Sequence, residues 1–518
     1  MERRPKYGIG QQSFEVLRNQ ECVYVDKTRF IEKIVESGGL YYFLGRPRRF
    51  GKSLFLSTLK CFFQGKRELF RGLYAERMNW DWEPHPVLHL DLNIEKYQDP
   101  NDLHEVLDNI FRQWEKEYDI ENQTSNLSLR FSNIIKGAYL KTGKRVIILI
   151  DEYDKPLVNN LHNKKQFESY RNELAAIYSN LKSSADYLRL VFMTGVSRFG
   201  DLSVFSGLNN IRDISFSDAF SDLCGITERE LTTYFQYGIS ELASKFQKGK
   251  DEIIMEMKRR YDGYRFSAYG EEIYNPFSVL NVMEDSDFRN YWISSGIATL
   301  LMLQLKRFHI RLETIINSKC NLSSLQGLDL DNPEPLALLY QTGYLTIKGY
   351  NQQRAIYHLG IPNLEVEEGF YSFLLPYYTN LHGSNSMVFV YNLVDEFNKG
   401  EVDAIIIQLK SLFSSISYEM KMDREENLHN ALLILMKLVG LEVETEYRTS
   451  NGRIDLFVKT DRYYYIIELK LDKSAREALD QINAKDYALP FATDGREIIK
   501  IGINFSTETR TISEWIAE

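Results

Sequence analysis

The feature that most constrains this chain is a buried strand that runs into a basic loop and then into a helix. Residues 40–44 are apolar, an arginine-rich loop follows, and Gly51-Lys52-Ser53 opens a segment with helical periodicity. This order is typical of a phosphate-binding loop, in which backbone N–H groups and a helix N-terminus surround the phosphates of a nucleotide. We expect Lys52 to reach the β- and γ-phosphates and the Ser53 hydroxyl to ligate Mg²⁺.

The loop departs from the common pattern at its first position. The pattern places a glycine at the position where this chain has Arg46, and Gly45 comes one residue too early. Either the loop is a variant that begins at Arg46 or it carries one extra residue. In both cases we expect the nucleotide to contact the same residues: Arg46, Arg49, Phe50, Gly51, Lys52, Ser53 and Leu54.

A second buried strand supplies the acidic residues that such a loop needs. Residues 146–150 are apolar, and Asp151 and Glu152 follow at the end of the strand where open α/β sheets bind nucleotides. We expect Asp151 to hold Mg²⁺ through water and Glu152 to polarise the attacking water. The alternative is a buried strand that ends in a solvated acidic turn. The Gly-Lys-Ser loop upstream favours nucleotide binding.

The next strand, residues 188–195, ends beside two further candidate residues. Thr194 is expected to lie between the two preceding strands and to sense the γ-phosphate. Arg198 either stabilises transition-state charge, within one subunit or across an interface, or is a plain surface arginine. Strands alternate with helices from residue 40 to residue 200, a pattern that predicts a parallel α/β sheet in a phosphate-loop ATPase domain.

The residue patterns along the sequence predict four regions. Residues 1–210 form the ATPase domain, and residues 211–330 are mainly helical and are expected to form a lid. Within residues 331–422, a helix, a β-hairpin and a second helix resemble a small winged-helix module, followed by a helical linker. Such modules bind DNA or serve as packing elements. Residues 423–518 form the fourth region, an α/β domain.

This fourth region contains a second group of candidate catalytic residues. Asp455 lies among apolar residues in one strand, and Glu468 and Lys470 share a face of the next strand. Burying such charges together is expensive unless they pair or bind a metal. Asp455 and Glu468 offer hard oxygen ligands for Mg²⁺ or Mn²⁺. Such an ion lowers the pKa of the water bound to it, and Lys470 can orient that water.

Two flanking helices add candidates to this group. Glu426, on the preceding helix, is expected to complete the metal shell, and Gln481, on the following helix, to contact substrate. The alternative is a solvent-exposed sheet face that carries an ordinary network of ion pairs. The region also contains more acidic than basic residues, which is unlike a strong free-standing DNA-binding domain.

Composition limits the compartment and the partners. The chain has 518 residues and a net charge of −9, with no apolar run near the ~18 residues of a membrane span and no signal-peptide pattern at its N-terminus. Four scattered cysteines without a Cys-x-x-Cys pair indicate a reducing compartment and argue against structural zinc. We therefore expect a cytoplasmic protein without a membrane partner, which contacts nucleic acid through local patches.

Taken together, these motifs resemble a bacterial family that joins an N-terminal AAA-ATPase-like domain to a C-terminal PD-(D/E)XK nuclease-like domain. The ATPase part is also similar to archaeal-type ATPases with an arginine-rich phosphate loop, and Arg46 looks typical of the family. The resemblance covers nearly the whole chain and rests on residues 24–28, 46–53, 150–156, 194–199, 205–210, 261–264, 452–455, 468–470 and 481–482.

The resemblance implies ATP and a divalent metal as cofactors. It assigns the catalytic carboxylates to Asp455 and Glu468 and the catalytic lysine to Lys470; the helical glutamate falls on Glu426, although Glu425 is adjacent. The expected function is an ATPase coupled to a metal-dependent nuclease that acts on nucleic acid; we expect DNA, and the sequence leaves RNA open as the alternative. The alternative is a nucleotide-dependent switch or scaffold, able to form homo-oligomers, whose nuclease-like domain binds nucleic acid without cleaving it.

Overall fold

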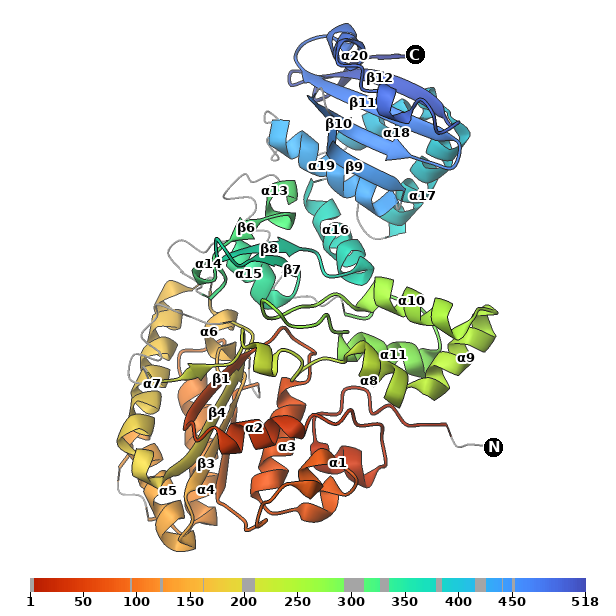
Figure 1. Ribbon diagram of the computed structural model, residues 1–518. Coiled ribbons are helices and arrows are strands. Elements are labelled where there is room, and N and C mark those ends of the chain that lie inside the picture. The colour runs from red at the N-terminus through yellow and green to blue at the C-terminus, as the bar shows by residue number, and fades with distance from the viewer. Residues whose placement is uncertain are drawn as a thin grey trace. The chain divides into compact units, whose positions relative to one another are not determined.

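The computed structural model divides into two compact units. It describes residues 4–93, 96–121, 124–161, 163–197, 210–292, 312–326, 335–378, 384–414, 425–439, 441–449 and 452–518. The N-terminal unit comprises Met1–Leu301 and Ile316–Val366, and the C-terminal unit comprises Met302–Ile315 and Glu367–Glu518 (Figure 1).

A five-stranded parallel sheet forms the centre of the N-terminal unit. The strands lie in the order β2-β3-β4-β1-β5. Their central members are buried on both faces, which explains why they read as continuous apolar runs. Their bounds are β1 Tyr41–Gly45, β2 Val87–Asp91, β3 Val146–Asp151, β4 Leu188–Gly195 and β5 Arg212–Asp213. The predicted parallel α/β sheet is confirmed.

Helices cover this sheet on both faces. In Figure 1 the strands lie between α3 and the pair formed by α5 and α7. Because all the strands are parallel, the loops after β1, β3 and β4 meet at one edge of the sheet. The helices of this layer are α1 Phe14–Asn19, α2 Arg29–Glu36, α3 Lys52–Phe63, α4 Asp102–Glu117, α5 Leu127–Thr142, α6 Lys155–Asn159 and α7 Lys164–Ser183.

A helical subdomain follows the sheet. Its apolar residues form a separate core cluster, in which Tyr7 from the N-terminal segment packs among residues of the helices. The helix α8 begins with a capping box, in which Thr227 and Glu230 satisfy each other's backbone N–H groups. The helices are α8 Glu228–Tyr234, α9 Gln236–Phe246, α10 Lys250–Tyr261 and α11 Pro276–Asp285.

A small three-stranded sheet is built from β6 Lys319–Cys320, β7 Thr346–Asn351 and β8 Ile356–Gly360, in the order β6-β8-β7. The predicted helix, hairpin and helix are present as α15 Pro335–Thr342, β7–β8 and α16 Leu364–Tyr378; α13 Leu312–Ile316 and α14 Ser323–Gln326 precede them. Residues 337–342 of α15 are all buried. The side chains of these residues therefore pack against the protein.

The C-terminal unit contains a mixed sheet in the order β13-β12-β11-β10-β9. The α20 helix connects β11 to β12, which pair in parallel, and the other neighbours are antiparallel. The strands are β9 Glu442–Thr449, β10 Gly452–Lys459, β11 Tyr463–Leu471, β12 Glu497–Ser506 and β13 Thr511–Ala517. The helices are α17 Ser384–Lys399, α18 Val402–Ser414, α19 Glu425–Val439 and α20 Ala475–Ala484.

Short 3₁₀ turns complete the description: η1 Arg67–Phe70, η2 Tyr74–Arg77, η3 Ala185–Tyr187, η5 Asp218–Phe220 and η6 Leu489–Phe491. In the part of the chain that the structure describes, no helix combines the length and apolar character needed to cross a bilayer. The four cysteines are all buried.

Candidate active sites

The phosphate loop links β1 to α3 and centres on Lys52. Gly51 caps α3 in the left-handed region at φ 93°, a conformation that glycine adopts without strain. The Lys52 side chain is buried, and its Nζ donates to the carbonyls of Arg46 at 3.1 Å and Pro47 at 3.3 Å. The same ammonium lies 3.3 Å from Glu152 Oε1. The loop lysine is thus held by its own loop and by the end of β3.

The two acidic residues after β3 lie in different environments. Asp151 is buried, and its Oδ1 accepts hydrogen bonds from the Thr194 hydroxyl and the Glu152 N–H. Burial opposes ionisation of Glu152, but the charges of Lys52 and Arg48 outweigh it and hold the pKa of Glu152 below its ordinary value. The structure therefore brings together the predicted residues Lys52, Asp151, Glu152 and Thr194.

Residues 153 and 154, which were not among the sequence candidates, join this site to the end of β4. Asp154 Oδ2 accepts the backbone N–H groups of Val196 at 3.1 Å and Ser197 at 2.6 Å. The Tyr153 hydroxyl donates to the Ser197 carbonyl at 2.8 Å. A Cβ on Gly195 would lie 2.7 Å from the Tyr153 ring, so only glycine permits this close approach. Burial and the nearby charge of Glu152 raise the pKa of Asp154 to about 7.

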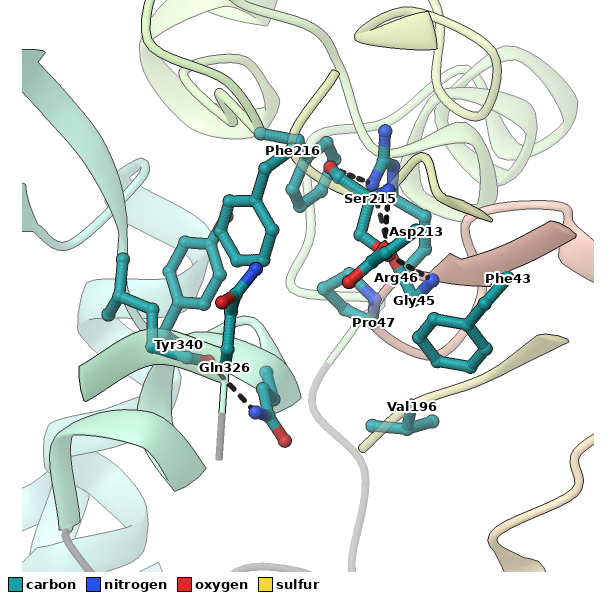
Figure 2. Close-up of a pocket in the computed structure, with 13 residues that line it drawn as sticks. Phe43, Gly45, Arg46, Pro47, Val196, Asp213, Ser215, Phe216, Gln326 and Tyr340 are labelled. Carbon is teal, nitrogen blue, oxygen red and sulfur yellow. Dashed lines mark hydrogen bonds between the residues drawn. The ribbon is translucent and has the colours of Figure 1, made fainter. Parts of the chain in front are cut away.

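The guanidinium groups of Arg46 and Arg49 are directed to protein carbonyls. Buried Arg46 donates to the carbonyls of Ser215 at 2.7 Å and Phe220 at 3.1 Å, as Figure 2 shows for Ser215. Arg49 donates to the Tyr291 carbonyl at 2.9 Å. The Phe50 ring is also buried and packs against Tyr264 and Phe266. These three residues remain in the loop, but their side chains stabilise the protein around it.

A largely apolar cavity lies beside the other end of the loop. Gly51 and Leu54 contribute to its wall, directly before and after Lys52-Ser53. Most of the remaining wall comes from the N-terminal segment, from residues 223–226 and from the helical subdomain, including Tyr7, Gly8, Gln11, Val25, Leu223, Gly225, Ile226, Phe235, Pro276 and Leu280. A flat apolar ligand group next to the phosphate loop fits this position.

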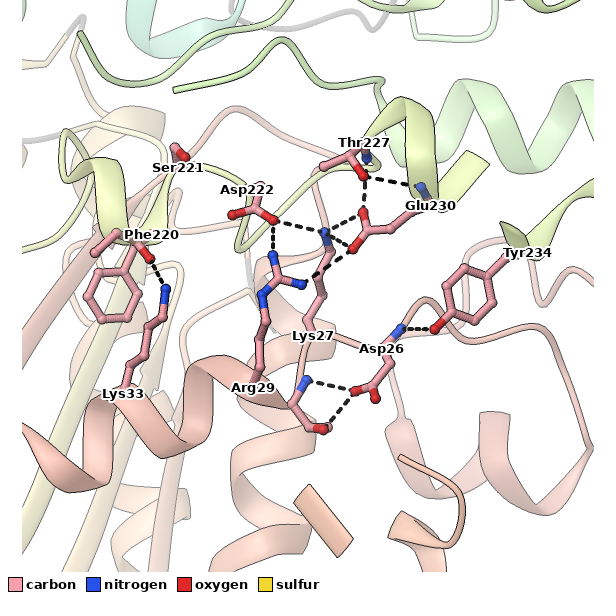
Figure 3. A network of polar contacts seen from close by, with 12 residues as sticks. Asp26, Lys27, Arg29, Lys33, Phe220, Ser221, Asp222, Thr227, Glu230 and Tyr234 are labelled. Atoms are coloured by element: carbon pink, nitrogen blue, oxygen red, sulfur yellow. Dashed lines mark hydrogen bonds and ion pairs between the residues drawn. The ribbon is translucent and has the colours of Figure 1, made fainter. Parts of the chain in front are cut away.

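An ion-pair network joins the N-terminal segment to the helical subdomain at the edge of this cavity (Figure 3). Lys27 Nζ lies 2.6 Å from Glu230 Oε2 and 3.9 Å from Asp222 Oδ2. Arg29 pairs with the same Asp222. The side chain of Asp26 accepts hydrogen bonds from Thr28. The motif at residues 24–28 therefore holds one wall of the cavity in place.

The second centre lies in the C-terminal unit, where β10, β11 and α20 bring four predicted residues together. Lys470 Nζ donates to Glu468 Oε1 at 3.3 Å and to Gln481 Oε1 at 2.6 Å, and the Gln481 amide donates back to Glu468 Oε1. Asp455 Oδ2 accepts the Leu469 N–H at 2.8 Å. Burial and the negative charge of Asp455 raise the pKa of Glu468 to about 8.

Glu468 provides the test of whether these residues suit a metal ion. Its side chain is buried, and its Oε2 has no hydrogen-bond partner among the described residues. A hard divalent cation would satisfy that oxygen, with Asp455 as the second carboxylate ligand. Across the residues described, no three His, Cys, Asp or Glu side chains gather to hold a metal. Glu426 lies in α19, but its side chain is outside the described residues, as is the whole of Arg198.

Family models match the two parts of the chain that contain these centres. A family model described as "Predicted AAA-ATPase" matches residues 8–205, and one described as "PD-(D/E)XK nuclease superfamily" matches residues 423–515. A protein of Azotobacter chroococcum mcd 1, named "Uncharacterized protein in vnfD 5'region", is 33% identical over 529 residues, which cover 99% of each chain. The chain belongs to this AAA-ATPase-like and PD-(D/E)XK nuclease-like family.

In this AAA-ATPase-like and PD-(D/E)XK protein, Tyr487 is a further site residue that sequence reasoning missed. Burial raises the pKa of Tyr487, while hydrogen bonds to Gln481 and to the backbone of Arg453 oppose that shift. A Cβ on Gly452 would lie 2.7 Å from the Tyr487 hydroxyl, so the glycine before Arg453 makes room for it. Its position in the sequence, six residues after Gln481, carries no recognisable spacing signal.

Proposed function

We propose that this protein binds and hydrolyses ATP and couples that reaction to a metal-dependent phosphodiesterase that cleaves DNA. The observation that carries the proposal is the buried Glu468, whose Oε2 has no partner among the described residues, beside Asp455, Lys470 and Gln481. A buried carboxylate oxygen without a partner is costly, and a bound cation removes that cost. The same chain contains Lys52 and Glu152 in a phosphate-loop sheet.

At the nucleotide site, the phosphates occupy the loop and the base enters the apolar cavity beside Gly51 and Leu54. Lys52 binds the terminal phosphates after exchanging its contact with Glu152, and Glu152 then orients the attacking water. Ser53 and Asp151 are the residues that would hold Mg²⁺, which neutralises phosphate charge when bound. Thr194 keeps Asp151 in place through its hydroxyl.

At the second site, Asp455 and Glu468 are the residues that would hold Mg²⁺ or Mn²⁺. The ion would lower the pKa of bound water and polarise the scissile phosphate. Lys470, fixed by Glu468 and Gln481, holds a positive charge where negative charge develops on the phosphate. The proposal also includes a cytoplasmic location and assembly into homo-oligomers.

One observation favours a second candidate, a nucleotide-dependent switch that holds nucleic acid without cleaving it. Lys52 and Glu152 neutralise each other in this structure, so nucleotide binding must separate them before hydrolysis. A site that binds ATP but separates this pair slowly would act as a switch rather than as a fast ATPase.

The test incubates the purified full-length protein with linear and circular DNA, with Mg²⁺ or Mn²⁺, with and without ATP. Asp455→Ala is expected to lower cleavage by at least about a hundredfold, and Lys52→Ala to abolish the ATP dependence. Asp461→Ala and Lys116→Ala, at exposed positions, are the matched controls. ATP-dependent DNA binding without cleavage in the wild type would favour the switch. Cleavage that survives Asp455→Ala would contradict the proposed active site.

A further inference from the structure

Glu365 is a buried carboxylate that neither of the two proposed reactions uses. It is the second residue of α16 and is 1% exposed. Its Oε2 accepts the Ser278 hydroxyl at 2.6 Å. Its Oε1 accepts the backbone N–H groups of Tyr291 and of Trp292, the second at 2.9 Å. Three hydrogen bonds offset the cost of burying the carboxylate, and in return the carboxylate fixes the backbone at residues 291 and 292.

The phosphate loop holds the same short segment through its carbonyl groups. Arg49 donates to the Tyr291 carbonyl at 2.9 Å and to the Trp292 carbonyl at 3.4 Å. The Trp292 indole N–H in turn donates to the Arg48 carbonyl at 3.4 Å. The peptide unit between Tyr291 and Trp292 therefore donates its N–H to a carboxylate and accepts at its C=O from a guanidinium. Because the N–H and C=O of a trans peptide point in opposite directions, this unit links the two charged side chains.

Arg49 needs such contacts because its backbone is strained. It adopts the left-handed region at φ 67°, which is unfavourable for a residue with a Cβ and persists when the surroundings determine it. Besides the two carbonyls, the Phe277 ring contacts the guanidinium, with its centroid at 4.1 Å. Arg49 comes two residues before Gly51, the cap of α3, and three before Lys52. The contacts of Arg49 therefore determine how the loop enters α3.

We propose that Glu365 is a positioning residue for the nucleotide site, which acts on the phosphate loop through the Tyr291–Trp292 peptide unit and Arg49. The inference rests on the proposed nucleotide-binding function. The charge of the carboxylate polarises the peptide unit, whose carbonyl then holds the guanidinium and keeps the loop in the conformation that surrounds the phosphates. Since the loop surrounds the phosphates of ATP and ADP alike, losing this charge weakens the binding of both. Lys52 and Glu152 are held by other contacts, so the hydrolysis of bound ATP changes less.

The test measures ATP and ADP affinity by calorimetry, and single-turnover hydrolysis at saturating ATP, with full-length wild type, Glu365→Gln, Arg49→Gln and the double variant. Glu365→Gln removes the charge and little else, because its amide oxygen still accepts the two N–H groups and its NH₂ can donate to the Ser278 hydroxyl. It should weaken the binding of both nucleotides about tenfold and change the hydrolysis rate less than about threefold. The double variant should bind ATP as Arg49→Gln does, within about twofold, because Glu365 acts through Arg49.

Glu284→Gln, at an exposed position of α11, is the matched control and should bind both nucleotides as the wild type does. Thermal unfolding of each variant shows that its fold is intact. If Glu365→Gln binds both nucleotides within about twofold of the wild type, or if its effect adds in full to that of Arg49→Gln, Glu365 only stabilises the fold and the inference is wrong. If the wild type binds neither nucleotide, the proposed function fails, and the inference fails with it.

Discussion

The two candidate active sites differ in how their charged groups are partnered. In the N-terminal unit, Lys52 is held by two loop carbonyls and by Glu152, and Asp151 accepts two hydrogen bonds. In the C-terminal unit, Glu468 keeps one buried oxygen without a partner among the described residues. The first site satisfies its own charges, and the second leaves a carboxylate that needs a cation.

This difference separates two ways of binding a ligand. A nucleotide that enters the first site must exchange an existing ion pair for new contacts, so its binding is coupled to a rearrangement of Lys52 and Glu152. A cation that enters the second site removes the cost of burying charge and breaks no contact of Glu468 Oε2. The proposed nucleotide site therefore suits regulation, and the proposed metal site is preorganised.

The largest effect is expected from Glu468→Gln, which removes the carboxylate that the second site offers to a cation. DNA cleavage should fall about a thousandfold, because the amide is a poor ligand for a hard cation. The melting temperature without metal should rise, because a neutral amide avoids the burial cost that raises the pKa of Glu468. Nuclease assays and thermal unfolding with and without Mg²⁺ measure both effects.

Glu477→Gln, at an exposed position of α20, provides the matched control for this substitution. It should leave cleavage, the melting temperature and the Mg²⁺-induced shift unchanged. If the Glu468→Gln protein is still stabilised by Mg²⁺ as strongly as the wild type, Glu468 is not a metal ligand and the contrast between the two sites disappears.

A smaller effect is expected from Glu152→Gln in the proposed nucleotide site, where ligand binding should strengthen while the reaction slows. Removing its charge releases Lys52 from the ion pair, so ATP should bind several-fold more tightly, by about 1 kcal/mol. Hydrolysis should fall about a hundredfold, because the amide is a poor general base. Equilibrium binding measures the ATP affinity and single-turnover hydrolysis measures the rate. Glu105→Gln, at an exposed position of α4, is the control. Weaker ATP binding in Glu152→Gln would show that the ion pair does not restrain Lys52.

The sequence was sufficient to predict what depends on local pattern. The strands β1, β3 and β4 were predicted because burial on both faces produces uninterrupted apolar runs. The proximity of Glu468 and Lys470 follows from the two-residue period of a strand. The meeting of Asp151 with Thr194 follows from the rule that parallel strands end at the same edge of the sheet.

Contacts between distant segments could not be predicted in this way. Arg46 reaches carbonyls at residues 215 and 220, and no local pattern distinguishes it from Arg48 two positions later. Tyr487 enters the second site through the turn after α20, where periodicity carries no information. The strands β12 and β13 were not predicted, because Lys500, Asn504 and Glu514 interrupt their apolar residues.

The smallest effect is expected at Asp154. This carboxylate is buried like that of Glu468, but it has hydrogen-bond partners, so it shows what burial does by itself. Like Glu468 it has a raised pKa, about 7, but its carboxylate accepts two backbone N–H groups. Between about pH 4 and pH 7 the native state keeps a proton that the unfolded state has lost, so stability falls as the pH rises through this window and is level above it.

Asp154→Asn removes the titrating group, so the variant should lack this slope. Its stability relative to wild type should therefore improve by about 2–4 kcal/mol from pH 4.5 to pH 7.5, even though the amide satisfies the two N–H groups less well. Thermal unfolding at a series of pH values measures the difference, and Asp119→Asn, at an exposed position, should show no such trend. If the stability difference between Asp154→Asn and the wild type does not change with pH, Asp154 is ionised throughout. Its two N–H hydrogen bonds then favour ionisation more than burial opposes it. Partners rather than burial would then set the charge of each buried carboxylate, which would strengthen the case that Glu468 needs a cation.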